Sequence, residues 1–410
     1  MNVLIISPTF PPMSSGGADF VFRLSEQLAE RGNTVSVVTS AITNIATGRN
    51  FKVLPVMRDW SWGELARLIK IVRKTKPDVV DIHFSGGIYK HHPMVTYFPA
   101  LLKRWLGGAR LVMHVEYPEP TGSPDRWSRS RLIRKGIMMS CGRRATDHGF
   151  GTLLRDSDQV IVLCDSHIGA LSDRYAGVAE KSVMIPPPPC VVLSENSAGQ
   201  ARKRGRAELG LAPTDVLAAY YGYIYPNKGI ETLLDGFELA SRKFPNLRLV
   251  LIGGANELVL KNLKRPDYIQ ELKDRATKLG VGDKVIWTQY FPSESEQPSI
   301  LLRSADLCVL PFDSGISMHR STFGVAAVHD LPVISTRGPT LESPFRDGEN
   351  ILLCPPQDAT ALAEAMMQLI ASPELRERLR AGVREMAARH FSWPTCAERT
   401  LRVFAGDKPF

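Results

Sequence analysis

The chain has 410 residues and a net charge of +9, with 44% hydrophobic and 23% charged residues. This composition is that of a globular protein and excludes a disordered chain, a collagen, a coiled-coil rod and a small disulfide scaffold. At roughly 150 residues per domain, the length suggests two or three domains. The six cysteines include no Cys-x-x-Cys pair, which argues against a zinc ribbon or a thioredoxin site and favours free thiols in a reducing compartment.

The start of the chain resembles a first β-strand more than a targeting segment. The run Val3–Ser7 follows no basic region and is too short for a signal peptide. No apolar run reaches the roughly 18–20 residues that a membrane span needs. We therefore expect a cytoplasmic protein.

Apolar β-rich runs alternate with amphipathic stretches through the first half of the chain. Helices are expected between the runs, for example at Asp19–Arg31 and Trp62–Lys74. Continuous Val, Ile and Leu runs separated by helices predict parallel strands that are covered on both faces. The predicted strands are Val3–Ser7, Val35–Thr39, Val53–Val56, Val79–Phe84, Arg110–Glu116, Gln159–Cys164 and Ser182–Ile185.

The tract Pro186–Pro189 interrupts this pattern, and the polar and basic residues after it look like an interdomain linker. The pattern then restarts. The predicted strands are Val216–Ile224, Arg248–Gly253, Lys284–Tyr290, Asp306–Phe312, Val333–Thr336 and Asn350–Cys354, and the predicted helices are Ile230–Phe244, Glu294–Arg303, Ser321–His329, Ala359–Ala371, Pro373–Arg389 and Thr395–Phe404.

We predict two doubly wound, Rossmann-like α/β domains. The first covers 1–190, a linker covers 191–205, the second covers 206–385, and a C-terminal helix in 386–410 packs back toward the first domain. Ligands bind outside the carboxyl ends of the strands in such sheets. With two such domains, the natural site is a cleft between them.

The positive charge is concentrated in one segment. Residues 126–155 carry eight Lys and Arg against one Asp, with apolar residues interleaved. Cations beside apolar side chains suit an anionic bilayer surface, at about 1 kcal/mol per cation near the lipid. A solvated basic loop, or a segment that packs on the other domain, explains the same pattern. No nucleic-acid-binding motif accompanies the charge. The acceptor-side candidates in this segment are Arg126, Arg129, Arg131, Arg134 and Lys135.

Gly16 and Gly17 lie between the first strand and the first helix. Glycines at a helix N-terminus let backbone N–H groups approach a ligand, although a plain turn explains the pair equally well. The pair is not the Gly-x-Gly-x-x-Gly pattern of dinucleotide enzymes, which occurs nowhere in the chain. Its absence argues against a Rossmann oxidoreductase.

Lys228 follows the first strand of the second domain and precedes a helix, within the stretch Gly222–Glu231. A lysine there lies beside the positive pole of the helix, which is mildly unfavourable without an anion. This position suits a phosphate, with lysine acting as a point charge. An exposed lysine in a first helical turn is the alternative.

A second anion-binding loop is predicted at Pro311–Gly324. A buried strand ends there, and a helix begins near Ser321. The free N–H groups of the first turn, with Arg320, Ser321 and Thr322, could bind an anion, each charge-assisted hydrogen bond contributing about 1.5–3 kcal/mol. Ser321 is also a good N-cap, so capping alone is the alternative. Lys228 and this loop together could hold a diphosphate without a metal.

His114 and Glu116 fall on one face at the end of a predicted strand, and His83 ends the preceding strand in the same way. In this architecture the carboxyl ends of the strands form the wall of the cleft. A satisfied structural histidine is the alternative for each.

These residues resemble glycosyltransferase family 4, a group of GT-B-fold, retaining enzymes that use nucleotide sugars. The resemblance runs nearly from end to end, and it rests on the order and spacing of its pieces. They are the Pro-Pro and Gly16-Gly17 opening, Arg31–Val35, Ile185-Pro186, Gly222 with Lys228-Gly229, Leu331–Thr336, Glu342, Asp347–Asn350, Pro356–Asp358 and Phe391–Trp393.

The resemblance implies a GT-B fold, with a nucleotide-sugar donor in the second domain and an acceptor in the first. Lys228 would hold the diphosphate, and His114 would face the transferred sugar. Gly16 and Gly17 would approach the donor phosphate. The remaining donor-binding candidates are Tyr223, Ser317, Met318, His319, Arg320, Ser321, Thr322 and Glu342, and the acceptor-side candidates include His83 and Glu116.

Two departures from the family pattern stand out. The usual pair of glutamates, eight positions apart, falls on Ser317 and Val325, and Val325 cannot bind ribose hydroxyls. The usual arginine of the lysine loop is Tyr223, and Arg320 is placed to restore that cation. These departures leave room for an altered or lost activity.

We therefore predict a metal-independent, retaining transfer of a sugar to an acceptor hydroxyl, in the assembly of cell-envelope polysaccharide or glycolipid. The basic segment adds peripheral contact with the inner face of the cytoplasmic membrane. A degenerate nucleotide-sugar-binding or scaffold protein is the first alternative. A sugar-nucleotide 2-epimerase is the second, although its acidic catalytic residues are not evident.

Overall fold

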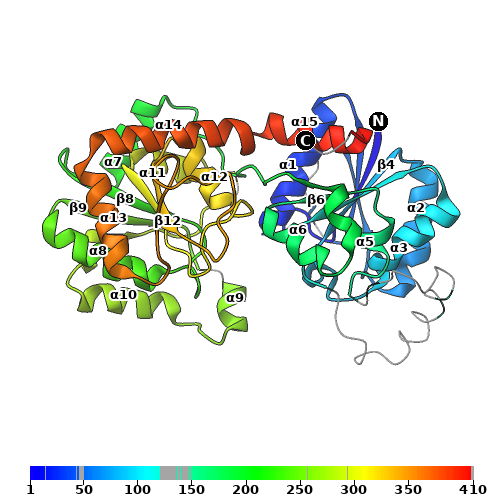
Figure 1. Ribbon diagram of the computed structural model, residues 1–410, viewed down its shortest axis with the longest axis horizontal. Coiled ribbons are helices and arrows are strands. Elements are labelled where there is room, and N and C mark those ends of the chain that lie inside the picture. Colours follow the sequence, from blue (N-terminus) through cyan, green and yellow to red (C-terminus); the bar gives the residue numbers. More distant parts are fainter. Residues whose placement is uncertain are drawn as a thin grey trace. The chain divides into compact units, whose positions relative to one another are not determined.

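The computed structural model describes residues 1–13, 15–42, 44–45, 50–120, 136, 139, 147, 149–255, 257–292 and 294–407. The chain forms two compact units, each a parallel sheet with helices on both faces (Figure 1). The first unit contains Met1–Pro186 together with Trp393–Phe410, and the second contains Pro187–Ser392. The predicted doubly wound α/β fold is confirmed in both units. Among the described residues, no helix combines the length and hydrophobicity needed to cross a bilayer.

The first unit has a seven-stranded sheet in the order β3-β2-β1-β4-β5-β6-β7. The order reverses direction between β1 and β4, which makes the ends of these strands the expected ligand site. The strands are β1 (Asn2–Ile6), β2 (Thr34–Ser40), β3 (Lys52–Met57), β4 (Val79–Phe84), β5 (Arg110–Val115), β6 (Gln159–Val162) and β7 (Ser182–Met184). The helices are α1 (Gly16–Glu30), α2 (Leu65–Thr75), α3 (Met94–Leu101), α5 (Leu153–Asp156), α6 (Asp165–Ser172) and α15 (Trp393–Ala405).

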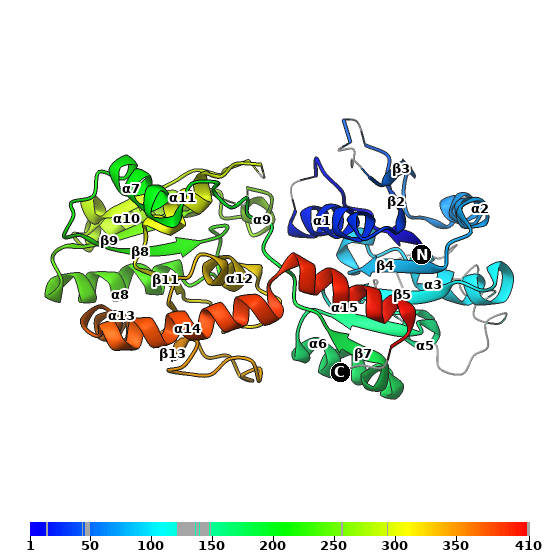
Figure 2. The same cartoon turned by 90° about the horizontal axis from the view of Figure 1, so that it is seen from above.

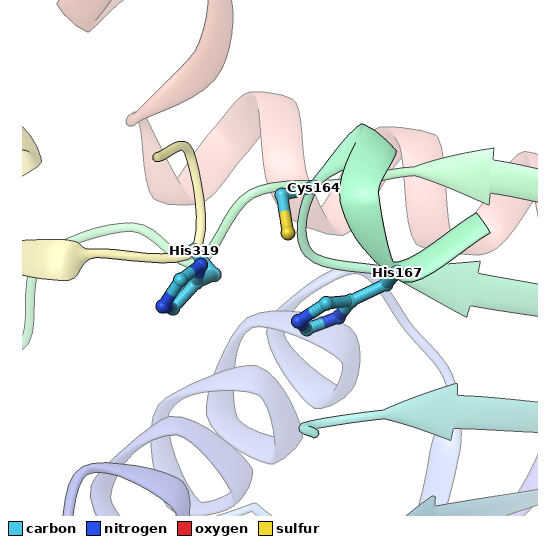
Figure 3. Close-up of side chains that lie close together, drawn as sticks. All are labelled: Cys164, His167 and His319. Carbon is cyan, nitrogen blue, oxygen red and sulfur yellow. The ribbon is translucent and has the colours of Figure 1, made fainter. Parts of the chain in front are cut away.

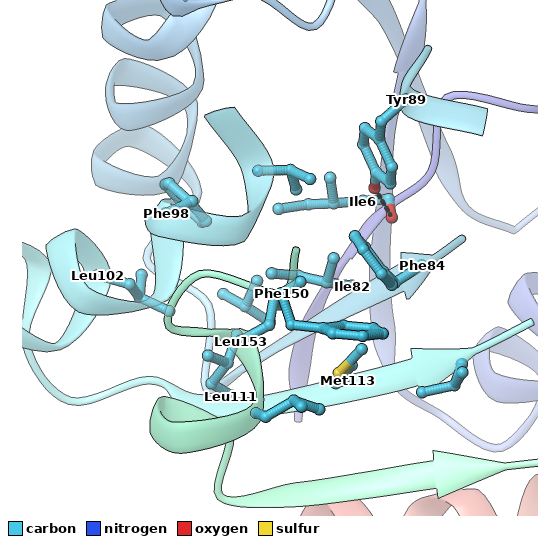
Figure 4. Packing of buried hydrophobic residues seen from close by; sticks show 14 of the residues in the cluster. Ile6, Ile82, Phe84, Tyr89, Phe98, Leu102, Leu111, Met113, Phe150 and Leu153 are labelled. Atoms are coloured by element: carbon cyan, nitrogen blue, oxygen red, sulfur yellow. Dashed lines mark hydrogen bonds between the residues drawn. The ribbon is translucent and has the colours of Figure 1, made fainter. Parts of the chain in front are cut away.

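Alternation along the strands separates two cores in this unit. In β1, Val3 and Ile5 belong to the core against α1 and α15, whereas Leu4 and Ile6 belong to the opposite core. Figure 4 shows residues of the opposite core, where Phe98 and Phe150 pack over the sheet. Burial on both faces explains why these strands are continuous apolar runs.

The end of the chain completes the first unit. Helix α15 lies along α1 (Figure 2), and its Cys396, Val403 and Phe404 are buried in the core on that face of the sheet. The helix is also fixed by a polar contact, because Arg399 donates a 2.8 Å hydrogen bond to the Met184 carbonyl.

The second unit has a six-stranded sheet in the order β10-β9-β8-β11-β12-β13, which reverses between β8 and β11. Its strands are β8 (Val216–Tyr221), β9 (Leu247–Ile252), β10 (Val285–Trp287), β11 (Leu307–Leu310), β12 (Val333–Thr336) and β13 (Leu352–Cys354). Its helices are α7 (Ala198–Glu208), α8 (Ile230–Lys243), α9 (Glu257–Asn262), α10 (Tyr268–Lys278), α11 (Gln297–Ser304), α12 (Ser321–Val328), α13 (Ala359–Ala371) and α14 (Pro373–His390).

The segment 191–205, whose composition suggests a linker, contains most of helix α7. The helix begins with a capping box in which Ser197 and Gln200 satisfy each other's backbone N–H groups. Gly205 then packs so closely on α11 that an added Cβ would lie 2.7 Å from the Ile300 carbonyl oxygen. The polar and basic residues therefore form the surface of a packed helix, which composition alone cannot distinguish from a linker.

Candidate functional site

In the second unit, one glycine brings the loops after β8 and β11 together. Gly229 caps α8 in a left-handed conformation, with φ of 72°. A Cβ at this position would collide with the Pro311 carbonyl oxygen. Glycine is therefore required here, and its close approach places Lys228 beside Phe312 at the end of β11.

Lys228 and Arg320 share the ring of Phe312. The Lys228 ammonium lies 5.2 Å from the centre of this ring and 4.7 Å from that of Tyr225. The Arg320 guanidinium lies 4.0 Å from the Phe312 ring. Such cation–π contacts can hold two like charges close together when no anion is present. The sequence predicted both cations at this site, but it did not indicate the aromatic ring between them.

Burial, and secondarily the charge of Arg320, lower the pKa of Lys228 to about 8. No carboxylate among the described residues lies within 4.0 Å of its ammonium. Arg320 is held in place by its own loop, donating to the Gly315 carbonyl at 3.1 Å and to Ser314 Oγ at 2.6 Å. The arrangement is a pair of positioned cations that an anion would stabilise.

Helix α12 begins immediately after this pair. Its N-cap is Arg320, whose side chain does not cap the helix, and Ser321 is the first helical residue. The suggested capping role of Ser321 is therefore wrong. Thr322 Oγ1 is buried and has no hydrogen-bond partner among the described residues. The first turn thus keeps polar groups available for a ligand.

Glu342 reaches back into the same loop. Its buried carboxylate accepts hydrogen bonds from Ser317 Oγ at 2.9 Å and from the Met318 backbone N–H at 2.6 Å. His319 Nδ1 lies 2.8 Å from Ser317 Oγ. A carboxylate therefore contacts position 317 even though the residue there is serine.

The other unusual positions have different surroundings. Val325 is buried in α12, and its backbone carbonyl lies 2.7 Å from His329 Nδ1. The Tyr223 ring is parallel to that of Tyr290, with the ring centres 6.1 Å apart. An aromatic pair therefore stands where the family resemblance leads one to expect an arginine.

In the first unit, four titratable residues meet at the ends of β4 and β5. His83 and His114 are register partners on these neighbouring strands, so their side chains share a face. Their rings are stacked at 4.4 Å with an angle of 19° between the planes. Asp81 lies two residues before His83, and Asp81, His83 and His114 are all completely buried. Asp81 was not among the site residues predicted from the sequence, although an acidic residue inside a strand that is buried on both faces is unusual and could have indicated it.

Charge pairing in this cluster opposes the cost of burial. His83 Nε2 lies 3.3 Å from Asp81 Oδ2, and His83 Nδ1 lies 3.7 Å from Glu116 Oε1. Burial, the largest single influence, would lower the pKa of His83, but the Asp81 and Glu116 carboxylates together outweigh it and raise the pKa to about 9. Burial would likewise raise the pKa of Asp81, yet His83 and His114 together outweigh it and lower the pKa to about 2. Burial and the neighbouring charge of His83 lower the pKa of His114.

Asp81, His83 and His114 come close enough together to suggest a metal centre. The stacking of the two imidazoles argues against one. Their planes are nearly parallel, so the in-plane lone pairs of their nitrogens cannot both point at one ion in a tetrahedral site. The cluster instead has the composition of an ion pair in which one imidazolium lies between two carboxylates.

His114 was expected at the wall of a cleft. Its ring is instead completely buried, with the Phe20 ring 5.1 Å away, and Phe20 in turn contacts Trp393. The side chain of Glu116 is 19% exposed, whereas those of Asp81, His83 and His114 are fully buried. Glu116 is therefore the residue through which the cluster can meet a ligand.

The glycine pair adjoins this carboxylate. A Cβ on Gly17 would lie 2.7 Å from Glu116 Oε2, whereas a Cβ on Gly16 would meet no atom within 4 Å. Ser15 caps α1 by accepting a 3.1 Å hydrogen bond from the Ala18 N–H. The absence of a side chain at Gly17 leaves the space that the carboxylate occupies.

Two further polar side chains lie at the start of α6 (Figure 3). Cys164 precedes the helix, with its Sγ 3.2 Å from Ser166 Oγ. His167 lies in the first turn, and burial lowers its pKa to about 4, so its imidazole is neutral at pH 7. The predicted acceptor-side cations at 126, 129, 131, 134 and 135 lie outside the described residues.

Two family models match the chain, one in each unit. The model "Glycosyl transferase 4-like domain" matches residues 15–188, and "Glycosyl transferases group 1" matches residues 201–386. Together the two matches cover most of the chain. The chain therefore belongs to the GT-B glycosyltransferases of the family 4 type.

Curated relatives and solved structures agree with this assignment. D-inositol 3-phosphate glycosyltransferase of Nocardia farcinica is 28% identical, over 95% of this chain and 85% of that protein. The enzyme of the same name from Segniliparus rotundus is 30% identical over 62% of this chain, and that match spans about half (53%) of its length. The structure of HepE from Anabaena in complex with UDP has a TM-score of 0.70, with 16% identity over 99% of this chain and all of that one. This last likeness concerns the fold.

Proposed function

We propose that this glycosyltransferase moves a sugar from a nucleotide diphosphate sugar to an acceptor hydroxyl with retention of anomeric configuration. The observation that carries the proposal is the pair Lys228 and Arg320, held against Phe312 at the point where the second sheet reverses its strand order. Two positioned cations beside a helix N-terminus suit a diphosphate. The UDP complex of HepE supports the choice of ligand class by analogy of fold.

The same residues would stabilise the leaving group. As the bond between the sugar and the diphosphate breaks, negative charge develops on the phosphate oxygens. Lys228, Arg320 and the first turn of α12, with Ser321 and Thr322, would bind that charge in a preformed arrangement. Positively charged side chains of the chain would thus stabilise the leaving diphosphate in place of a metal ion. We therefore propose a metal-independent reaction.

The sugar would be bound by the loop that Glu342 organises. Ser317, Met318 and His319 are brought together by the Glu342 carboxylate, which accepts a hydrogen bond from Ser317 at the position of the first family glutamate. His114 is proposed to face the sugar on the strength of the family resemblance. Because its ring is completely buried, the surrounding side chains would have to move before it could contact a ligand.

Retention requires the acceptor oxygen to enter on the face that the phosphate leaves. The acceptor O–H bond breaks, a new bond forms between that oxygen and the anomeric carbon, and the bond from this carbon to the phosphate oxygen breaks. The acceptor proton passes to the departing phosphate oxygen. This route needs no enzymic nucleophile, in contrast to the carboxylate pair of retaining glycosidases.

Ligand binding tests this proposal directly. Thermal unfolding in the presence of UDP, GDP and ADP should show stabilisation by at least one of them, because a ligand that binds the folded state raises the unfolding temperature. Lys228→Ala should remove most of that shift and lower turnover about 10–100-fold, the equivalent of a contact of roughly 1.5–3 kcal/mol. Lys278→Ala, at the exposed end of α10, is the matched control. Wild-type behaviour of Lys228→Ala would contradict the assigned role.

A nucleotide-sugar-binding protein without transferase activity is the second candidate, favoured by Ser317 and Val325 in place of the usual glutamates. A donor-hydrolysis assay separates the two. Nucleotide binding without turnover of any nucleotide sugar would favour the binding protein, whereas conversion of the donor to another nucleotide sugar would indicate an epimerase.

We also propose an acceptor in cell-envelope polysaccharide or glycolipid assembly, approached at the inner face of the cytoplasmic membrane. The support is the basic, partly apolar sequence at 126–155. Flotation with liposomes that contain phosphatidylglycerol should carry the protein at low salt. No flotation at low salt would remove this part of the proposal.

A further inference from the structure

The cluster in the first unit has a feature that the transfer chemistry does not require. Asp81, His83 and Glu116 form a line in which each nitrogen of the imidazole faces one carboxylate. The oxygens of Asp81, both nitrogens of His83 and Oε1 of Glu116 have no hydrogen-bond partner among the described residues. A line of buried, unsatisfied polar atoms that ends at a partly exposed carboxylate points to a ligand at that end.

The exposed end adjoins Gly17. Oε2 of Glu116 occupies the space that a side chain at Gly17 would fill. This is the helix N-terminus that the family resemblance assigns to the donor phosphate. A carboxylate there repels a phosphate by like charge, whereas it accepts a hydrogen bond from a neutral hydroxyl.

We propose that Gly17 and Glu116 form a subsite for an uncharged hydroxyl of the acceptor, such as that of a sugar or polyol, with Glu116 Oε2 as the hydrogen-bond acceptor. The proposal deepens the proposed function by naming the chemistry of the acceptor. His83 is a positioning residue that holds Oε1 of Glu116, and Asp81 keeps His83 charged. His114 stacks on His83 from the neighbouring strand, and the Tyr89 hydroxyl donates a 2.9 Å hydrogen bond to the His83 carbonyl.

The test measures binding of a neutral and an anionic probe to the full chain. Saturation-transfer NMR with methyl α-D-glucopyranoside and, separately, glucose 6-phosphate is recorded in the presence of UDP. We expect transfer to the neutral glycoside in the wild type and a loss of at least severalfold in Glu116→Gln. Equal transfer in Glu116→Gln, no transfer to the neutral glycoside in the wild type, or transfer to the phosphate alone would each overturn the proposal.

Two glycines of the first unit provide a second, independent variant and its matched control. Gly17→Ala forces the Glu116 carboxylate to move, because the new Cβ would lie 2.7 Å from Oε2, so transfer to the glycoside should fall. Gly169→Ala, in α6, has open space around the new Cβ and should keep the wild-type signal. Circular dichroism establishes that each variant is folded. Equal signals in the two alanine variants would contradict the subsite.

The affinity for UDP distinguishes an acceptor subsite from a donor site. It should be the same in Glu116→Gln as in the wild type, and tighter binding would mean that a donor phosphate approaches Glu116.

The pH dependence of glycoside binding tests the role of His83. Glycoside binding in the wild type should weaken as the pH rises through about 9, where His83 loses its proton. The variant His83→Gln should bind the glycoside weakly at every pH. If the wild type binds the glycoside but no nucleotide, the proposed function fails and the subsite stands.

Discussion

Each unit has titratable side chains at the point where its sheet reverses strand order, but the charges there differ between the two units. In the second unit, the reversal between β8 and β11 lies beside two cations, Lys228 and Arg320, which both contact the Phe312 ring. In the first unit, the reversal between β1 and β4 lies beside a buried imidazolium between two carboxylates. The fold thus provides a place for a ligand, and the side chains at the strand ends decide which charge that ligand carries.

The largest expected effect sharpens this contrast on the cationic side. Lys228→Ala combined with Arg320→Ala should lower turnover by about 100–1,000-fold, because the double variant has lost both charges that face the leaving group. Steady-state kinetics at saturating donor measure this loss. The variant Arg320→Lys should give a turnover only slightly above that of Arg320→Ala, since an ammonium does not reproduce the stacked, forked guanidinium. A double variant no slower than either single one would mean that the two cations act as a single unit.

The next effect concerns stability and lies in the first unit. Asp81→Asn leaves His83 buried without its main counter-charge, a change that costs about 3–5 kcal/mol for buried pairs in general. Urea unfolding followed by circular dichroism measures it. Asp313→Asn, in the second unit, carries no such pair among the described contacts and is the control. An unchanged midpoint in Asp81→Asn would show that the ion pair does not stabilise the unit.

The ion pair of Asp81 and His83 also predicts how the free energy of unfolding depends on pH. The pKa of His83 is raised to about 9 in the folded state, so the stabilisation is complete below the unfolded value near 6.5 and is lost as the pH rises through 9. In Asp81→Asn, His83 loses the larger of the two charge pairings that raise its pKa, and the decline in unfolding free energy between pH 6.5 and 9 should become smaller. A wild-type profile that is flat over this range would contradict the charged state of His83.

The smallest effect is a pH dependence of ligand binding in the second unit. Because the pKa of Lys228 is about 8 without ligand, this lysine must take up a proton from the solvent when UDP binds above that pH. The dissociation constant for UDP should therefore rise above pH 8, by at most about tenfold per pH unit. Lys228→Arg keeps its charge and should bind UDP with little change up to pH 9.5. Calorimetric titration at several pH values measures both proteins.

The sequence predicted the sheets, the order of elements and the cationic loop, because these depend on local patterns. Strand β4 is found at the predicted residues Val79–Phe84, and Lys228 and Arg320 both lie against the Phe312 ring. Other features depend on contacts between distant residues. The link from Glu342 to Ser317 spans 25 positions, and the role of Gly17 follows from Glu116, 99 residues later. Neither contact leaves a signal in the local sequence.

Helix α15 has a consequence for the order in which the protein is made. The first unit takes its last helix from residues 393–405, so the core face that α1 and α15 cover together lacks part of its cover until synthesis passes the whole of the second unit. The unit translated first is then the one completed last. The intervening Pro187–Ser392 can form its core from a continuous stretch of chain. Part of the apolar face of the N-terminal sheet stays exposed until α15 has been synthesised.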